Sequence, residues 1–361
     1  LYSLIPCGVG GKGILKLSDA EFRRMTTLGA RWCVDNGYGR PDDLKHTEEG
    51  GCLAGADPEK CSDRAVERGR SQLGTLGSGN HYLEVQVVQP DNVYDPKTAE
   101  ALGIDRPYQI VVMVHCGSRG FGHQVASDYL KVFTKAMKRF GIETTDKELG
   151  CAPYRSDEGR DYFGAMNCAA NSAFANRQVI THRIREGFTR VFGKSENELG
   201  LDVIYDVCHN IAKLERYEID GQQQDLLVHR KGATRSFGPG SEHIPDDYRA
   251  VGQPVIVGGS METGSYLLVG TEKAMTGTFG STLHGSGRVM SRTKARKSVR
   301  GETLRDDMLK RGIAIRTASL RGLAEEAGFA YKDIAEVVRA VDDIGISRRV
   351  VRFIPIGNIK G

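Results

Sequence analysis

Segments with the composition of β-strands are short in this chain, and they do not alternate regularly with segments that carry helical patterns. A doubly wound parallel sheet needs a helix between successive strands, so this irregular order argues against that fold. We predict instead an α+β fold with mixed or antiparallel sheets. The strand-like segments are rich in β-branched residues and cover residues 83–88, 109–115, 201–208, 225–229, 254–257, 266–269, 313–316 and 350–354.

Helical patterns occupy much of the remaining sequence. The segment Ser18-Asp19-Ala20-Glu21 resembles a capping box, and apolar residues follow it at helical spacing as far as Trp32. Because no repeat, low-complexity tract or linker interrupts the sequence, we predict one domain over residues 1–361. Further helices are predicted at residues 124–140, 157–192, 303–311, 319–327 and 331–343.

Composition excludes several classes of protein. Apolar residues make up 39% and charged residues 27% of the 361 residues, and there are 45 glycines, a profile typical of a globular, loop-rich protein. The longest strictly apolar run, residues 110–114, is far shorter than the ~20 residues that cross a bilayer, so we expect no membrane partner. The beginning of the chain does not resemble a secretory signal. The eight cysteines form no Cys-x-x-Cys pair, which favours reduced thiols and a cytoplasmic location.

Four of the nine histidines lie at unusual places in the sequence. His81 immediately precedes a predicted strand, His115 ends one, His209 follows the end of another, and His284 lies in a glycine-rich loop. Neutral imidazole is a common metal ligand, and three imidazoles that converge from strand ends could hold an ion. A single histidine of this kind is more often a hydrogen-bonded structural residue. Residue types alone therefore leave both interpretations open.

Small residues surround His284 in Gly280-Ser281-Thr282-Leu283-His284-Gly285-Ser286-Gly287-Arg288. Glycines let backbone N–H groups approach an anion, and an accessible neutral imidazole can attack phosphorus to form a phosphoramidate. An ordinary glycine-rich turn with a solvent-facing histidine is the alternative. A second small-residue loop, residues 258–265, could hold the phosphates or base of a nucleotide, although such turns between strands are common. Glu84 shares a strand face with Tyr82 and could bind a base edge or orient a ligand.

Positive charge is concentrated near this loop. The net charge is only +4, but residues 285–300 contain six Lys or Arg and no acidic residue. Such clustering is typical of a surface that binds phosphate-rich partners, and it is also found on ordinary solvated surfaces.

Together these segments closely resemble the signature motifs of RtcB-type RNA ligases, in the same order and over nearly all of the chain. Five long, ordered motifs are far more specific than a single short one. The motifs are Gly77-Ser78-Gly79-Asn80-His81-Tyr82-Leu83-Glu84-Val85, Val114-His115-Cys116-Gly117-Ser118-Arg119-Gly120, Tyr205-Asp206-Val207-Cys208-His209-Asn210, Val228-His229-Arg230-Lys231-Gly232-Ala233-Thr234-Arg235 and the loop around His284.

The resemblance implies a fold and an activity. The family's α+β fold has stacked mixed or antiparallel β-sheets, flanked by helices around a central cleft. Its members use GTP and two Mn²⁺ ions to join RNA ends that carry a 2′,3′-cyclic phosphate or 3′-phosphate to ends that carry a 5′-hydroxyl. The implied partners are tRNA halves in tRNA splicing, broken RNA in RNA repair, and the activating protein archease.

The resemblance also implies roles for individual residues. His284 would attack GTP and carry the guanylate, and His81, His115 and His209 would be metal ligands. The charge pattern alone makes Arg288, Arg292, Lys294, Arg296 and Lys297 candidates for the path of the RNA. The residues that match nucleotide-contacting positions are Asn80, His81, Tyr82, Leu83, Glu84, His209, Asn210, Gly258, Gly259, Ser260, Met261, Ser265, His284, Gly285, Ser286, Gly287 and Lys360.

One departure from the family pattern concerns the metal site. Family members carry an aspartate and a cysteine that complete this site upstream of the point where the present sequence begins, and Cys7 matches a later loop of the family. We therefore expect the chain to lack the N-terminal region of the family, to supply three metal ligands and to bind metal weakly, so that it can be inactive by itself. Two other hypotheses stay open: a metal-dependent phosphoesterase that does not need His284, and an RNA-binding remnant without turnover.

Overall fold

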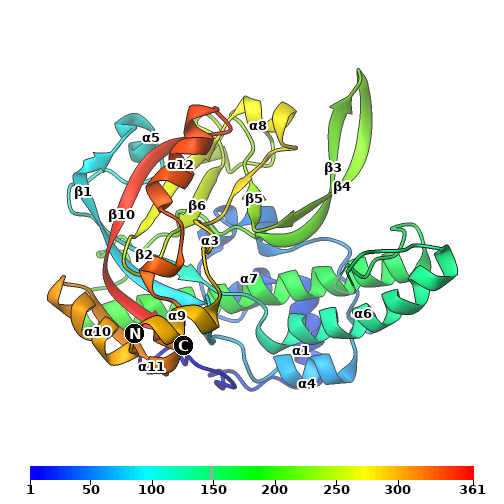
Figure 1. The fold of residues 1–361 in the computed structure, drawn as a ribbon, viewed down its shortest axis with the longest axis horizontal. Coiled ribbons are helices and arrows are strands. Elements are labelled where there is room, and N and C mark those ends of the chain that lie inside the picture. The colour runs from blue at the N-terminus through cyan, green and yellow to red at the C-terminus, as the bar shows by residue number, and fades with distance from the viewer. Residues whose placement is uncertain (147–148) are drawn as a thin grey trace. The chain divides into compact units, whose positions relative to one another are not determined.

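The computed structural model describes residues 1–146 and 149–361. It contains 40% helix and 22% strand, which confirms the predicted α+β class (Figure 1). The chain divides into two compact units, and the prediction of a single domain stays a prediction. Unit 1 comprises Leu1–Pro6, Gly10–Gly77 and Cys116–Asp202, and unit 2 comprises Cys7–Val9, Ser78–His115 and Val203–Gly361.

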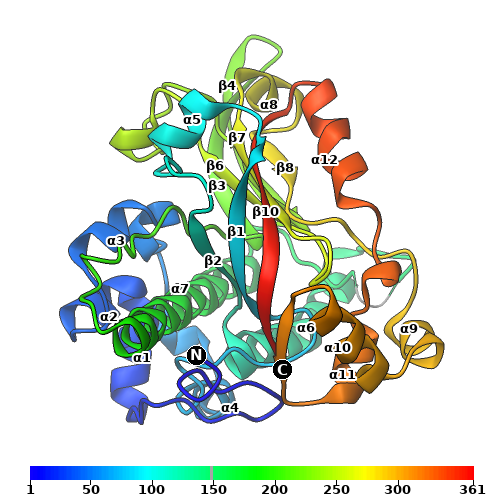
Figure 2. The ribbon, with the colours of Figure 1, turned by 90° about the vertical axis from the view of Figure 1, so that its left-hand side faces the viewer.

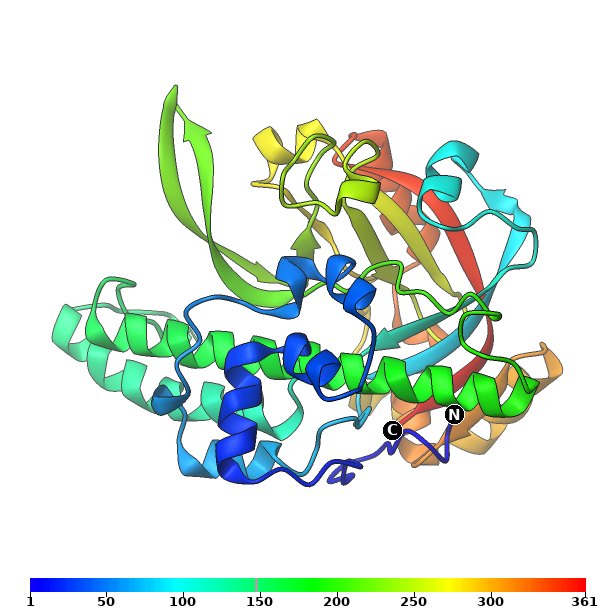
Figure 3. The same ribbon diagram turned by 180° about the vertical axis from the view of Figure 1, so that it is seen from behind.

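The regular elements described in unit 1 are helices. The two longest, α6 (Arg119–Phe140) and α7 (Asp157–Phe192), lie side by side (Figure 3). The bounds predicted for α7 are confirmed, and α6 begins five residues earlier than predicted. The shorter helices are α1 (Asp19–Leu28), α2 (Ala30–Asp35), α3 (Pro41–Lys45) and α4 (Asp63–Gly69), with 3₁₀ turns η1 (Glu48–Gly51) and η2 (Pro58–Lys60).

The predicted first helix is divided by Gly29. The capping box at its start is confirmed, because the Glu21 N–H donates to Ser18 Oγ and the Ser18 N–H donates to the Glu21 carboxylate. Gly29 then has φ +60°, and a Cβ there would lie 2.1 Å from the Gly51 carbonyl oxygen. The chain therefore ends α1 at Leu28 and starts α2 at Ala30.

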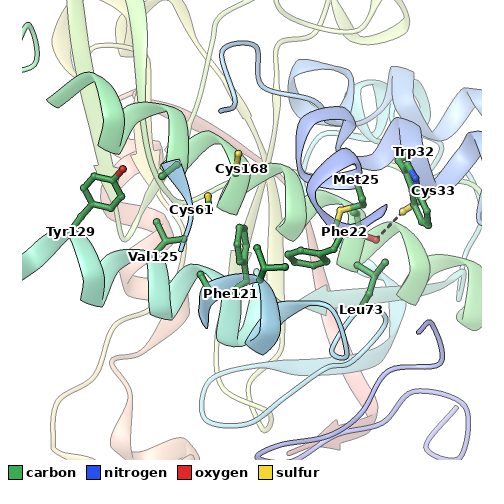
Figure 4. Packing of buried hydrophobic residues seen from close by; sticks show 14 of the residues in the cluster. Phe22, Met25, Trp32, Cys33, Cys61, Leu73, Phe121, Val125, Tyr129 and Cys168 are labelled. Carbon is green, nitrogen blue, oxygen red and sulfur yellow. Dashed lines mark hydrogen bonds between the residues drawn. The ribbon is translucent and has the colours of Figure 1, made fainter. Parts of the chain in front are cut away.

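The core of unit 1 lies where α1, α2, α4, α6 and α7 meet (Figure 4). The Phe22 and Phe121 rings pack edge to face with centroids 5.0 Å apart. A buried ion pair adds a polar element to this unit: Arg185 on α7 donates to both carboxylate oxygens of Asp43 on α3, at 2.6 and 2.7 Å. Both side chains are almost fully buried. The pair therefore links two helices that are far apart in sequence.

Unit 2 is built on one six-stranded sheet. Its order is β2-β1-β10-β7-β6, antiparallel throughout, and β9 pairs in parallel with the end of β10. Figure 2 shows the long strands β1 and β10 side by side. The bounds of these strands are β1 Tyr82–Val93, β2 Ile110–His115, β6 Pro254–Gly258, β7 Ser265–Gly270, β9 Ala314–Thr317 and β10 Ser347–Lys360.

Short helices complete unit 2. The predictions at residues 303–311, 319–327 and 331–343 correspond to α10, α11 and α12, with ends that differ by a few residues. No helix in the two described ranges combines the length and apolarity needed to span a membrane. The helices are α5 (Pro96–Ala101), α8 (Glu272–Gly277), α9 (Arg292–Ser298), α10 (Gly301–Lys310), α11 (Leu320–Glu325) and α12 (Ile334–Asp343), with 3₁₀ turns η3 (Asp246–Tyr248) and η4 (Gly328–Ala330).

Two further strand pairs belong to unit 2. The strands β3 (Asn210–Ile219) and β4 (Gln222–Lys231) form a long hairpin that extends away from the six-stranded sheet (Figures 1 and 3). A shorter pair joins β5 (Ala233–Arg235) to β8 (Ser281–Leu283). The predicted strand at residues 225–229 is thus the central part of β4. The strand extends further in both directions because polar residues on either side also pair with β3.

The strand predicted at residues 201–208 is wrong. This segment contains no strand, and the ladder begins only at Asn210. Its apolar residues Ile204, Tyr205 and Val207 instead pack in the main core cluster of unit 2. Their β-branched and aromatic character therefore reflects burial of side chains and not backbone pairing.

Candidate functional site

The register of the central sheet places three predicted site residues in one row. Tyr82 on β1 is opposite His115 on β2 and opposite Lys360 on β10. Residues directly opposite in antiparallel strands share a face, so the three side chains lie next to one another. The Tyr82 and His115 ring centroids are 5.4 Å apart, and Lys360 Nζ lies 5.2 Å from the Tyr82 ring.

The next row on the same face is polar and buried. Glu84 is opposite Asn358, and both are about 3% exposed. Gln86, the next residue on this face, donates from Nε2 to Glu84 and, at 2.6 Å, to Ser265 Oγ. Asn358 Nδ2 donates to the Met261 carbonyl at 3.2 Å. Side chains from β1 and β7 thus form one hydrogen-bonded polar group, and Asn358 on β10 lies opposite Glu84 beside it.

The four histidines singled out from the sequence lie together in unit 2. His115 Nε2 and His209 Nε2 are 2.9 Å apart. The His209 ring stacks on the His284 ring, with centroids 4.5 Å apart and planes inclined by 27°. His81 is 6.0 Å from His115, measured between ring centroids. The sequence segments that supply these rings are up to 203 residues apart.

This arrangement fits part of a metal site. Two nitrogens on one ion, each about 2.0–2.1 Å from it, would be separated by roughly 3 Å, which is close to the distance between His115 and His209. Imidazole is compatible with Mn²⁺, although intrinsic affinity favours other divalent ions. Among the residues that the structure describes, no group of three His, Cys, Asp or Glu is arranged to hold an ion. To complete a metal site, the His81 side chain would have to turn towards His115 and His209, or further ligands would have to join these two histidines.

Burial favours the neutral form of His115 and His284. Burial and the neighbouring His209 and His81 hold the pKa of His115 well below its ordinary value. Burial also lowers the pKa of His284, and a backbone contact with Gly232 opposes this shift. A neutral imidazole has a lone pair for a metal ion or for attack on phosphorus.

Glycines position His284 at the end of β8. Gly232, which leads from β4 into β5, has φ +69°, and a Cβ there would lie 3.4 Å from His284 Cε1. On the other side, the Gly258 N–H donates to the His284 carbonyl at 3.1 Å, and the Ser286 N–H donates to the Gly258 carbonyl at 3.0 Å. The loop therefore binds to the end of β6 through its backbone, and small residues are required at the contacts.

The remaining predicted nucleotide contacts are distributed around this loop and the sheet. Ser260 and Met261 are buried in the turn between β6 and β7, whereas Asn80 and Asn210 are exposed. Leu83 is fully buried on the opposite face of β1 from Tyr82 and Glu84. The Leu83 side chain therefore packs in the interior. Only the Leu83 backbone, between Tyr82 and Glu84, could contact a nucleotide on their side of the strand.

Burial shifts the pKa of Glu84 and of Lys360 on the central sheet. Burial raises the pKa of Glu84 to about 7, against the opposing effects of Gln86 and Lys360. Burial likewise lowers the pKa of Lys360, and the carboxylates of Glu326 and Glu84 oppose this shift. A carboxylate and an ammonium group thus face the same buried region.

The cations proposed for the RNA path are less available than their sequence suggests. Arg292 pairs with Glu326 at 2.9 Å, and Arg288 approaches the same carboxylate at 3.4 Å. Arg296 pairs with Glu325 at 3.2 Å. Lys294 and Lys297 on α9 are exposed to solvent.

Sequence reasoning missed several residues of this site. Gln86 could have been found, because strand alternation places it on the face of Glu84. Glu326 and Tyr331 lie beside Lys360 and Arg288 only through tertiary contacts, and no local pattern indicates them.

Comparison with known proteins identifies the family of this chain. All residues, 1–361, match the family described as tRNA-splicing ligase RtcB. The chain belongs to the RtcB family. The resemblance inferred from its motifs is thereby confirmed. The roles of individual residues in this RtcB-family chain stay predictions.

Curated RtcB relatives are similar over the whole of this chain. The tRNA-splicing ligase RtcB of Archaeoglobus fulgidus is 54% identical over 361 residues, which cover 100% of this chain and 74% of the relative. The protein of the same name from Pyrococcus horikoshii is 53% identical over 362 residues, and that from Methanocaldococcus jannaschii is 50% identical over 361 residues. The chain spans 41% and 37% of the length of these two relatives and is itself covered completely.

Proposed function

We propose that this chain carries the catalytic residues of a GTP- and Mn²⁺-dependent RNA ligase that joins 2′,3′-cyclic phosphate or 3′-phosphate ends to 5′-hydroxyl ends. The observation that supports this proposal most strongly is the stacking of His284 on His209, whose Nε2 faces that of His115. A nucleophilic imidazole next to a pair of potential metal ligands is a combination that can carry out nucleotidyl transfer.

The reaction proceeds in three steps from the 3′-phosphate. A ring nitrogen of His284 attacks the α-phosphorus of GTP, the bond to the β-phosphate oxygen breaks, and pyrophosphate leaves. An oxygen of the RNA 3′-phosphate then displaces His284 from the guanylate and forms an RNA 3′-guanylate. The 5′-hydroxyl of the second RNA finally attacks the phosphorus of the former 3′-phosphate, loses its proton, and releases GMP. A cyclic phosphate end is first opened by water to the 3′-phosphate.

His81, His115 and His209 are the residues that would hold metal. A bound Mn²⁺ ion supplies charge neutralisation to phosphate oxygens. The stacked His209 ring keeps the His284 imidazole in a fixed orientation, and backbone bonds to Gly258 fix the position of its loop. Because the Ser286 N–H already donates to the Gly258 carbonyl, the N–H groups of Gly285 and Gly287 are the proposed anion-binding backbone for a phosphate.

Recognition of the guanine base is assigned to the buried polar rows of the sheet. Glu84 can accept from base N–H groups when ionised, and Lys360 can donate to a carbonyl oxygen. Around them, Asn80, Tyr82, Leu83, Asn210, Gly259, Ser260, Met261 and Ser265 are the further proposed contacts. The family fold, with stacked sheets around a central cleft, the RNA partners, archease and a cytoplasmic location belong to the same proposal.

The test is covalent labelling with α-³²P-GTP and Mn²⁺, applied to the 361-residue chain and to the complete gene product. We expect label that survives denaturation, is acid-labile and alkali-stable, and is absent from the His284→Ala variant. Label on the complete gene product alone would assign further metal ligands to residues outside these 361. Hydrolysis of a phosphate ester that persists in His284→Ala, without any label, would favour a phosphoesterase. Salt-sensitive RNA binding without turnover would favour an RNA-binding protein.

A further inference from the structure

A single buried carboxylate, that of Glu326, gathers three cations and a phenol in unit 2. Its side chain is 2% exposed, at the end of α11. One oxygen accepts from Arg292 Nε at 2.9 Å and lies 3.4 Å from Arg288 Nη1. The other accepts from the Tyr331 hydroxyl and lies 3.7 Å from Lys360 Nζ. Buried acidic groups are rare unless they are paired, and this one has four polar neighbours.

These neighbours come from separate parts of the sequence. Lys360 ends β10 in the row of Tyr82 and His115. Arg288 lies four residues after His284 and also contacts Tyr331, with its guanidinium 4.8 Å from the ring centroid and Nη1 3.0 Å from the hydroxyl. Glu326 therefore connects the end of the sheet with the segment that follows the His284 loop.

The charges around Glu326 are unbalanced. Three cations share this carboxylate, and the other acid near Lys360 is Glu84, whose pKa burial raises to about 7. Burial alone would raise the pKa of Glu326, but Lys360, Tyr331 and Arg292 together hold it below its ordinary value. Glu326 is thus ionised at neutral pH. Without its charge, Arg288, Arg292 and Lys360 would repel one another at close range in a medium that screens poorly.

We propose that Glu326 is a positioning residue of the nucleotide site: it fixes the Lys360 ammonium and the Arg288 guanidinium so that the sheet and the His284 loop bind one GTP molecule together. This inference rests on the proposed function. Glu326 itself is enclosed by its four partners and does not touch the nucleotide. Its effect is therefore on the affinity for GTP, through Lys360 and Arg288.

The adjacent residue provides a matched control. Glu325 carries the same charge and pairs with the single cation Arg296, and its side chain is 25% exposed. Its contact with Arg288 is made by the backbone carbonyl, which a side-chain substitution leaves in place. Glu325→Gln therefore removes the same formal charge one residue away without disturbing Lys360.

The experiment measures GTP affinity by titration calorimetry, and the rate of label incorporation at saturating GTP, for the complete gene product. We expect Glu326→Gln to weaken GTP binding roughly tenfold or more, because it removes a charge-assisted contact from a buried cation. The saturated rate should change much less. Glu326→Asp, which keeps the charge, should recover part of the affinity, and Glu325→Gln should match the wild type.

Thermal unfolding of each variant establishes that the protein measured is folded. If Glu326→Gln does not fold, GTP affinity is measured for Glu326→Asp instead. We then expect an affinity for GTP that is lower than that of the wild type by less than about tenfold. Equal affinities for Glu326→Gln and Glu325→Gln would overturn the inference, and so would a loss of saturated rate with unchanged affinity. A wild type that binds GTP without becoming labelled refutes the proposed chemistry alone. A wild type that does not bind GTP refutes both.

Discussion

The pair Arg230–Glu215 at the base of the β3–β4 hairpin allows a quantitative prediction. Arg230 donates to the two Glu215 carboxylate oxygens at 2.6 and 2.7 Å, to the Phe279 carbonyl at 2.9 Å and to Ser281 Oγ at 3.0 Å. The Arg230 and Glu215 side chains are 1% and 9% exposed. The pair therefore attaches the hairpin to the segment that enters β8 and ends at His284.

Replacement of Arg230 by Met retains most of the side-chain volume and leaves Glu215 as a buried charge without its cation. Loss of one partner from a buried pair typically costs about 3–5 kcal/mol, a large share of the 5–15 kcal/mol that stabilises an ordinary domain. We expect a loss of unfolding free energy in this range. The double variant Arg230→Met/Glu215→Leu should recover much of it, because removal of both charges avoids the penalty for the unpaired one.

Urea denaturation followed by circular dichroism measures these differences. The control is Arg216–Asp225 on the same hairpin, an ion pair with distances of 2.8 and 3.1 Å whose side chains are 67% and 61% exposed. Arg216→Met should leave the urea midpoint nearly unchanged. A loss of stability in Arg230→Met as small as that in Arg216→Met would show that the buried pair does not stabilise this unit. A double variant as unstable as Arg230→Met would assign the stabilisation to the bonds with Phe279 and Ser281 instead of the ion pair.

Three further predictions concern burial and pH. Burial opposes ionisation of Asp43, but bonds from Arg185 and other donors hold its pKa below the ordinary value, so this carboxylate stabilises unit 1 above about pH 4 and loses that effect as pH falls. Asp43→Asn should lower the urea midpoint at pH 7, and the midpoint should then fall less steeply as the pH is lowered. A midpoint that falls as steeply as in the wild type would contradict this prediction. The pKa of Glu84 is raised to about 7, so its contribution is present at low pH and is lost as pH rises from about 4.5 to 7. The melting temperature of Glu84→Gln, measured relative to that of the wild type, should be higher at pH 8 than at pH 5. The same difference in melting temperature at both pH values would argue against this effect of Glu84. Gly258→Ala should reduce labelling by GTP at least tenfold in a folded protein, because its Cβ would lie 2.5 Å from Tyr82 Oη; wild-type labelling would show that the loop tolerates the methyl group.

Local sequence patterns predicted the elements that carry their own signals. The capping box of α1, the bounds of α7 and most strands of the central sheet follow from caps, periodicity and β-branched runs. The segment 201–208 failed because core burial and strand pairing favour the same residue types. The polar strand β3 was missed because its pairing with β4 does not require an apolar face.

The candidate site could be predicted only in part for a related reason. Histidines at strand ends and in a glycine-rich loop are visible in the sequence, and the structure brings His81, His115, His209 and His284 together. Their contacts depend on sheet register and on the β5–β8 pair, which no local pattern specifies. The basic segment 285–300 shows the opposite error, because Arg288, Arg292 and Arg296 pair with carboxylates more than 25 residues away.

We propose that this chain belongs to an enzyme that joins RNA through the phosphorus of the 3′-phosphate. The most direct test uses an RNA with a ³²P-labelled 3′-phosphate, a second RNA with a 5′-hydroxyl, GTP, Mn²⁺ and the complete gene product. We predict a longer RNA in which the label lies in the new junction and resists phosphatase, with no product from His284→Ala. Release of the label as inorganic phosphate, or a joined product in which the label is absent from the junction, would show that the RNA is not joined through this phosphorus.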